Sequence, residues 1–181
     1  MESYKLTAVG DGTVGKTCML ITYTTNTFPQ DYTPTMFDSY ETDVNVNGVK
    51  THVILTDTAG QEDFDQLRPL SYNSTDCFIL CFSVASHPSF ENITQRWSIP
   101  ELKMHAPKVP IVLVATKVDC RSQPHLKLIS EAEGRALARR IEAYDYIETS
   151  AKTMTGLDQV FLSAIRAARN PKAKARRCNI L

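Results

Sequence analysis

The chain has 181 residues, of which 43% are hydrophobic and 22% are charged, and its formal net charge is zero. This length suits one domain with a core that needs no disulfides or structural metal, and no apolar run reaches the roughly 18 residues of a membrane span. The five cysteines and four histidines are scattered without the spacing of a disulfide framework or a metal site, so we expect reduced thiols. No apolar signal-peptide region opens the sequence, which predicts a cytoplasmic protein.

Charge is distributed unevenly along the chain. No acidic residue follows Asp158, so the tail is strongly basic while the rest of the chain is mildly acidic. This pattern argues against a general nucleic-acid surface and for a local electrostatic contact at one end. From Pro171 the composition changes to Lys, Arg and Ala, which predicts a domain over residues 1–170 and a flexible tail over 171–181. The basic residues after Asp158 are Arg166, Arg169, Lys172, Lys174, Arg176 and Arg177.

The first half of the chain predicts a strand, a helix and a hairpin. Residues 4–9 are typical of a short buried strand and residues 16–25 of the helix that follows, with a glycine-rich turn between them. Residues 41–46 alternate polar and apolar side chains, and Asn47-Gly48 is a strong hairpin signal. Residues 51–56 then predict the returning strand.

The second half alternates strands with helices. Its continuous apolar runs are typical of central parallel strands with helices on both faces. The pattern predicts a three-layer α/β sandwich that binds ligands at the carboxyl ends of its strands. Strands are expected at 77–84, 109–115 and 146–149, and helices at 89–105 with an interruption at Pro100, at 130–142, and after a capping box at 155–158.

The glycine-rich turn, residues 10–17, reads GDGTVGKT and matches the pattern G-x-x-x-x-G-K-[ST] between a strand and a helix. Its glycines let successive N–H groups point inward, and the helix N-terminus adds positive potential. We therefore expect Lys16 to reach the β- and γ-phosphates of a nucleotide and the Thr17 hydroxyl to bind Mg²⁺. Taken alone, the motif also fits an accidental glycine-rich turn. The candidate nucleotide-binding residues here are Gly12, Thr13, Val14, Gly15, Lys16, Thr17 and Cys18.

A second motif, DTAGQ, follows the strand at 51–56. At this place the Asp57 carboxylate can hold Mg²⁺ through water beside the glycine-rich turn of residues 10–17, which we call the P-loop. Beside Ala59, the Gly60 N–H can reach a γ-phosphate because no side chain blocks its approach, and Gln61 can orient an attacking water. The motif is weak by itself but specific at this spacing, and it predicts hydrolysis as well as binding.

Two further loops predict which base is bound. Lys117 and Asp119 follow the strand at 109–115, and the sequence Ser150-Ala151-Lys152 follows the strand at 146–149. The Asp119 carboxylate can accept from two guanine donors, whereas adenine offers an acceptor at N1. Lys117 can lie along the ring, and the Ala151 N–H can reach the guanine carbonyl. Either loop alone fits a surface charge pair, but together the loops favour guanine.

These four elements, in this order, resemble the Ras superfamily of small GTPases over nearly the whole chain. The resemblance implies a three-layer P-loop NTPase G domain with a mostly parallel six-stranded sheet, one antiparallel edge strand and about five helices. Phe28-Pro29, residues 32–40 and residues 61–72 look like switch I and switch II of the Rho family, as do Cys18, Trp97 and Pro100-Glu101. By this resemblance, Phe28 packs on guanine, Thr35 becomes an Mg²⁺ ligand in the GTP state, and Tyr32 contacts nucleotide. The implied effector-binding residues are Tyr32, Pro34, Thr35, Met36, Phe37, Asp38, Ser39 and Tyr40.

The sequence departs from the Rho pattern in four places. Thr116 stands where Asn is usual, so an altered tether to the P-loop is expected, and Thr56 replaces a usual aromatic residue. Ser98 looks like an extra residue before Pro100. The segment between Asp119 and Ser150 is too short for the additional helix of Rho proteins. The chain therefore resembles a divergent Rho relative.

The sequence ends in Cys178-Asn-Ile-Leu, a C-a-a-X pattern whose final Leu favours a geranylgeranyl group. One lipid together with the basic tail predicts reversible attachment to the cytoplasmic face of membranes, with the plasma membrane as the expected site.

The implied cofactors are GTP or GDP and Mg²⁺. The implied partners are an exchange factor, an activating protein, a GDP-dissociation inhibitor, and effectors such as kinases or cytoskeletal regulators, with a monomeric chain and no nucleic acid. Two alternatives stay open: a GTP-loaded binding module that hardly hydrolyses, and a small-metabolite P-loop kinase, which Asp119 and the DTAGQ segment disfavour. Arg68 is the nearest candidate for an arginine supplied in cis, but it lies in a segment resembling the partner surface of Rho proteins, and we interpret it as structural or as a contact with a partner.

Overall fold

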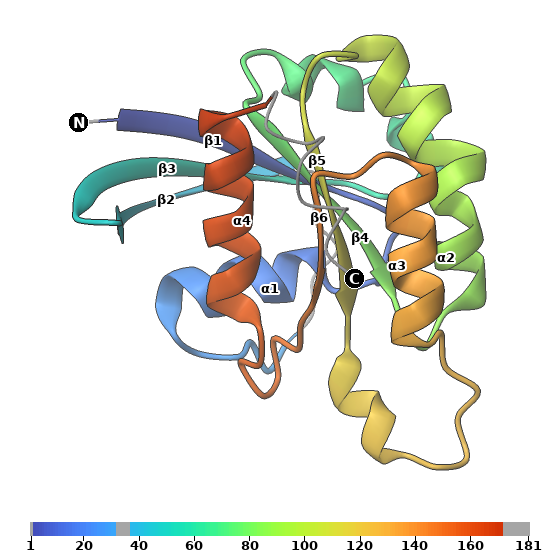
Figure 1. The fold of residues 1–181 in the computed structure, drawn as a ribbon. Coiled ribbons are helices and arrows are strands. Elements are labelled where there is room, and N and C mark those ends of the chain that lie inside the picture. Colours follow the sequence, from blue (N-terminus) through green and yellow to red (C-terminus); the bar gives the residue numbers. More distant parts are fainter. Residues whose placement is uncertain (1, 32–36, 172–181) are drawn as a thin grey trace.

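The computed structural model describes residues 2–31 and 37–171. Six strands form one sheet in the order β2-β3-β1-β4-β5-β6 (Figure 1). The edge strand β2 runs antiparallel to β3, and the other neighbours are parallel, as the resemblance implies. The strands are β1 (Glu2–Val9), β2 (Phe37–Val46), β3 (Val49–Thr58), β4 (Cys77–Ser83), β5 (Ile111–Thr116) and β6 (Asp145–Glu148).

Helices cover both faces of the sheet. Figure 1 shows α1 and α4 on one face and α2 and α3 on the other, which confirms the three-layer prediction. Within the described ranges there are four α-helices, of which α2 continues directly into a π-helix, η3. The helical segments are α1 (Lys16–Thr25), η1 (Glu62–Phe64), η2 (Arg68–Tyr72), α2 (His87–Asn92), η3 (Ile93–Lys103), η4 (Val118–Ser122), α3 (Glu131–Arg140) and α4 (Leu157–Arg169). In the described part of the chain, no helix combines the length and apolar character needed to cross a membrane.

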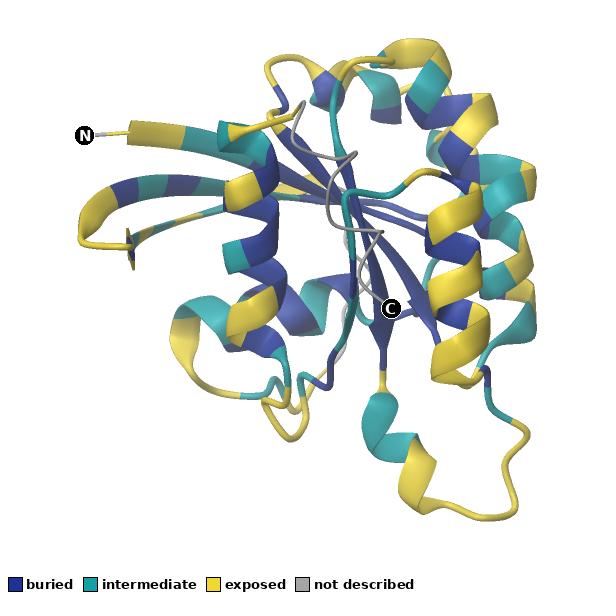
Figure 2. Cartoon of the chain, viewed as in Figure 1, coloured by how far each residue is buried: buried dark blue, intermediate teal, exposed yellow. Residues whose placement is uncertain are grey.

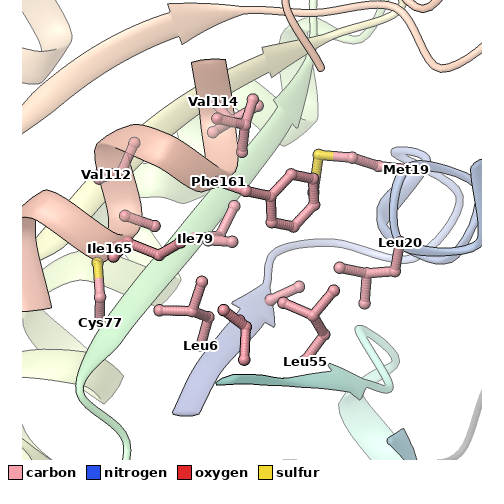
Figure 3. Packing of buried hydrophobic residues seen from close by; sticks show 14 of the residues in the cluster. Leu6, Met19, Leu20, Leu55, Cys77, Ile79, Val112, Val114, Phe161 and Ile165 are labelled. Carbon is pink, nitrogen blue, oxygen red and sulfur yellow. The ribbon is translucent and has the colours of Figure 1, made fainter. Parts of the chain in front are cut away.

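The core has two parts, one on each face of the sheet. All seven residues of β4 are buried, and their side chains alternate between the two parts, as expected of a central parallel strand. In Figure 3, Phe161 of α4, Met19 of α1 and Ile79 of β4 point into the first part. Figure 2 shows buried residues gathered on the sheet and on the inner sides of α3 and α4. The carboxyl ends of the parallel strands therefore project from a rigid support.

The predicted hairpin is confirmed. Asn47 and Gly48 both have positive φ, 56° and 82°, as a two-residue turn with the twist of the flanking strands requires. Between Asp119 and Ser150 the structure has α3 as its single α-helix, which agrees with the absence of an additional helix.

Two local predictions are wrong. The helix does not break at Pro100, because η3 passes through it with π-helical winding and so avoids the clash between proline and the carbonyl four residues earlier. Residues 155–158 form no capping box: α4 begins after Gly156, whose φ is +68° and which has no side-chain cap. A Cβ at Gly156 would lie 2.2 Å from the Glu148 carbonyl oxygen, so this tight turn requires glycine. The capping box that does form joins Ser130 and Glu133 at α3.

Candidate nucleotide-binding site

The P-loop curls between the end of β1 at Val9 and the start of α1 at Lys16. Gly10 and Gly15 have φ values of 139° and 100°, and a Cβ at Gly10 would lie 2.3 Å from the Cys81 carbonyl oxygen. No side chain caps the N-terminus of α1. The first N–H groups of this helix are therefore available to an anion, and the helix dipole favours one there.

Lys16 folds back across the loop. Its Nζ donates to the carbonyl oxygens of Gly10 at 2.8 Å and Asp11 at 2.7 Å, and the residue is only 5% exposed. Burial lowers the pKa of Lys16 to about 8, against weaker opposing contributions from Cys81 and Asp57. Without nucleotide, the buried charge of Lys16 is therefore energetically unfavourable, and a bound phosphate would stabilise it.

An acidic group and a hydroxyl meet where Mg²⁺ is expected. The Thr17 hydroxyl donates to Asp57 Oδ2 at 2.6 Å, and Asp57 is fully buried near the end of β3. Both side chains offer oxygen atoms as metal ligands beside the P-loop, and Mg²⁺ prefers oxygen ligands. The third expected ligand, Thr35, lies outside the described residues.

The DTAGQ segment packs directly on the P-loop. A Cβ at Gly60 would lie 2.3 Å from the Gly12 nitrogen and 2.4 Å from the Gly10 carbonyl oxygen, so only glycine fits. The Gln61 side chain reaches over Gly12, because a Cβ built there would lie 3.9 Å from Gln61 Cδ. Together these residues enclose a pocket of about 20 Å³, lined by Gly12, Thr13, Gly15, Lys16, Thr17, Thr58, Gly60 and Gln61.

A second, larger pocket of about 220 Å³ lies beside the first, and Gly15 contributes to both. Asp119 lines it, and the Ser150 hydroxyl donates to Asp119 Oδ1 at 2.6 Å. This bond keeps the carboxylate in a defined orientation. The walls are Gly15, Cys18, Met19, Phe28, Thr116, Lys117, Asp119, Cys120, Thr149, Ala151 and Lys152.

Thr116 and Lys117 tie this second pocket to the P-loop. The Thr116 hydroxyl donates to the Val14 carbonyl oxygen at 2.5 Å and lies 3.1 Å from that of Phe82. Lys117 Nζ donates to the Thr13 carbonyl oxygen at 2.7 Å. Threonine therefore makes a tether at this position despite replacing the usual Asn.

The structure thus gathers most of the predicted residues around two adjoining pockets. Four predicted residues do not line the pockets: Val14, Asp57 and Ser150 form hydrogen bonds with residues that do, and Ala59 lies between Thr58 and Gly60, which line the smaller pocket. Four expected effector residues, Phe37, Asp38, Ser39 and Tyr40, form the start of the edge strand β2, and the first three are exposed. Tyr32, Pro34, Thr35, Met36 and the expected lipidation site Cys178 lie outside the described residues.

Arg68 has a structural role, which is one of the two roles that the sequence predicted for it. Its side chain is fully buried, and it donates to the carbonyl oxygens of Ala59 at 2.6 Å and Gln61 at 2.8 Å. A further bond of 2.8 Å reaches Glu101. Its guanidinium group is therefore already engaged within the protein.

The sequence did not reveal the residues that bind Asp11, one of which, Trp97, also contacts Arg68. Asp11 in the P-loop accepts hydrogen bonds from Asn92, Arg96 and Trp97, over more than 80 positions in the chain. Trp97 and Glu101 stood out only as part of the family resemblance. The available signal was the spacing of these residues, since Trp97 follows Asn92 by five positions and Glu101 follows Trp97 by four, which matches a helix wound more widely than an α-helix.

A protein-family model described as the Ras family matches residues 5–170. The match spans the P-loop, the DTAGQ segment and both loops of the larger pocket. Members of this family are small GTPases that bind guanine nucleotides, generally with Mg²⁺, and act as switches. The chain belongs to the Ras family of small GTPases.

Proposed function

We propose that the chain hydrolyses GTP and cycles between GDP-bound and GTP-bound states, with Gln61 as its catalytic residue. The observation that carries the proposal is the position of Gln61 over Gly12, in the small pocket that Lys16 and Thr17 also line. A terminal phosphate in this pocket would meet a cation, a glycine N–H and a side-chain amide. These are the groups needed to bind the phosphate and orient an attacking water.

The larger pocket supports selectivity for guanine. Asp119, held by Ser150, can accept from the N1–H and the exocyclic amine of guanine. Adenine presents an acceptor at N1, which would leave the carboxylate poorly paired. Phe28 and Lys117 line the same pocket, where we expect both side chains to pack on the base.

In this proposal, different residues of the chain perform different parts of the hydrolysis. Lys16 bridges the phosphates, Gly60 donates its N–H to the γ-phosphate, and Gln61 positions the water. Bound Mg²⁺, held by Thr17 and by Asp57 through water, would neutralise charge on the phosphate oxygens. Because Arg68 is engaged elsewhere, the isolated chain should hydrolyse slowly, and a partner that donates an arginine should speed the reaction by roughly 10³- to 10⁵-fold.

The alternative is a GTP-loaded binding module with negligible hydrolysis. Gly12 leaves room for the Gln61 side chain, and Gly60 lies against the P-loop without a Cβ clash. With Gln61 itself present, this geometry favours the hydrolysing switch.

A Rho-like role is the finer part of the proposal. Leu67 and Leu70 in switch II are 52% and 75% exposed, and Phe37 is 41% exposed, so an apolar surface is available to partners beside the nucleotide site. The rings of Phe37 and Phe64 meet edge to face at 6.1 Å, which joins the two switches. We propose effectors of the cytoskeleton, polarity or trafficking, together with an exchange factor, an activating protein and a dissociation inhibitor. Thr56 leaves the matching exchange factor open.

We further propose that Cys178 is prenylated and that the basic residues before it bind an anionic membrane surface. One lipid chain alone holds a protein weakly, so both signals should be needed. Fractionation of cells that express the Cys178→Ser variant should find it in the soluble fraction. Retention of that variant on membranes would contradict this part of the proposal.

Single-turnover hydrolysis tests the central proposal. Unmodified protein and Gln61→Leu, each loaded with GTP, should be compared with and without a Rho-type activating domain. The variant should keep its GTP affinity and lose the stimulated rate. Equal stimulated rates would refute the role of Gln61, and fast unstimulated hydrolysis would mean that the chain itself supplies an arginine.

A further inference from the structure

One helical segment, α2 with η3, holds the P-loop through a single carboxylate. Asp11, between Gly10 and Gly12, accepts from Asn92 Nδ2 at 2.7 Å, Trp97 Nε1 at 2.8 Å and an Arg96 nitrogen at 3.4 Å. All three donors come from residues 92–97. The position of the P-loop backbone beside Gly12 is thereby fixed against this helix.

The same segment also holds switch II. Glu101 of η3 accepts from Arg68 at 2.8 Å and from the Tyr72 hydroxyl, and Arg68 donates to the carbonyl oxygens of Ala59 and Gln61. Arg68 is fully buried and Glu101 is 8% exposed. Buried charge-assisted bonds of this kind fix geometry strongly, because no water replaces a lost partner.

Trp97 lies between these two attachments. Its ring is fully buried, and the guanidinium carbons of Arg68 and Arg96 each lie 4.6 Å from the ring centre. Arg96 and Arg68 also share Asp65 Oδ1, at 2.6 Å and 2.8 Å. A continuous chain of contacts thus joins the backbone of Gln61 to the carboxylate of Asp11.

The π-helical winding of η3 aligns this chain of contacts. In an α-helix, at about 100° per residue, Glu101 would point about 180° away from Asn92. A π-helix has a wider turn, with hydrogen bonds from i to i+5, so residues four to five positions apart share a face. Asn92, Arg96, Trp97 and Glu101 follow this spacing. Ser98, which looks like an extra residue in the sequence, lies within η3, and the wider turns of a π-helix have room for one additional residue.

We propose that η3 is the positioning element of the hydrolysis site, and that Trp97 is the positioning residue that couples switch II to the P-loop. The inference rests on the proposed GTP hydrolysis. Trp97 touches neither nucleotide pocket; it acts through Asp11 on the P-loop and through Arg68 on the backbone of Gln61.

Trp97→Phe tests this role, since it keeps an aromatic ring for the two arginines and removes the N–H that binds Asp11, together with part of the buried indole ring. Single-turnover GTP hydrolysis should fall by about tenfold or more, because small displacements of a catalytic group have large effects on rate. GDP affinity should change by less than about twofold. Ile99→Ala is the matched control, because Ile99 lies on the same helix and is 59% exposed. This control should hydrolyse at the unmodified rate.

A double-mutant cycle with Gln61→Leu separates positioning from general damage. If Trp97 acts through Gln61, the Trp97→Phe change should have little further effect on the residual rate of Gln61→Leu. An unchanged rate in Trp97→Phe would overturn the proposal. So would a loss of equal size in both backgrounds, or parallel losses of hydrolysis, GDP affinity and melting temperature.

Fluorescence gives a readout that does not depend on hydrolysis. Trp97 is the only tryptophan of the chain, and two guanidinium groups lie over its ring. Exchange of GDP for a non-hydrolysable GTP analogue should shift its emission, and Glu101→Gln, which weakens the hold on Arg68, should reduce that shift. Equal shifts in both proteins would overturn the coupling. If the unmodified chain binds GTP but never hydrolyses it, even with an activating domain, the proposed function fails while this fluorescence test still decides the coupling.

Discussion

Lys16 should lower the stability of the nucleotide-free protein, although we expect nucleotide binding to depend on it. Burial lowers its pKa from 10.5 to about 8. Between these values the unfolded chain binds more protons than the folded one, so stability rises with pH through this window. The difference in pKa corresponds to about 3 kcal/mol, present as a penalty below pH 8 and removed as the pH approaches 10.5.

The perturbation that tests this linkage is Lys16→Met, which has similar length and no titrating group. Urea unfolding of both nucleotide-free proteins should be followed from pH 7 to pH 10.5. The unmodified protein should gain about 1 kcal/mol relative to the variant by pH 9, and about 3 kcal/mol by pH 10.5. The difference between the two proteins isolates Lys16, because all other groups titrate in both.

Nucleotide binding supplies the second half of the assay. If phosphates restore an ordinary pKa to Lys16, GDP affinity should fall about tenfold between pH 7 and pH 9, and calorimetry at pH 9 should detect uptake of about 0.9 proton. Parallel pH profiles of stability for the unmodified protein and Lys16→Met would refute the reasoning. So would binding at pH 9 without proton uptake.

Three other substitutions test the site. Gly60→Ala should weaken GTP binding more than GDP binding in competition assays, because its Cβ would meet the Gly12 nitrogen at 2.3 Å and displace the N–H that is proposed to bind the γ-phosphate. Unchanged GTP and GDP affinities in the variant would contradict the close packing. Thr116→Val should lower the free energy of unfolding by about 1–3 kcal/mol in urea titrations, because the Val14 carbonyl loses its donor, and an unchanged value would show that the tether is dispensable. Asp119→Asn should shift preference from guanine to xanthine nucleotides, and equal displacement of GTP by ATP from the unmodified protein would disprove the base assignment.

Local sequence patterns predicted much of the fold because the forces behind them are local. The helix at 16–25 and the turn at Asn47-Gly48 follow from backbone preferences, and the apolar runs follow from burial of parallel strands on both faces. The predicted capping box at 155–158 was wrong because Gly156, in a left-handed conformation close to the Glu148 carbonyl, occupies the N-cap of α4 and has no side chain to cap it. The predicted interruption at Pro100 was wrong because π-helical winding accommodates the proline.

The chemistry of the site could likewise be read from residue types and spacing. A lysine after glycines predicts a phosphate, an aspartate at a strand end predicts a metal ion, and a glutamine four residues later predicts an attacking water. Pairs that lie far apart in the sequence could not be read in this way. The bonds from Ser150 to Asp119 and from Thr116 to Val14 exist because parallel strands bring their carboxyl ends together at one edge of the sheet.

By itself, the sequence determined the expected class of ligand, since the residues predicted to bind phosphate and to select guanine are identified by their chemistry. Only the tertiary structure decided how Gln61 is held. Arg68 could have faced the phosphate or the interior, and its burial against Trp97 and Glu101 follows from packing across distant segments. Because burial sets both the orientation of Arg68 and the pKa of Lys16, neither property is encoded in any short stretch of the chain.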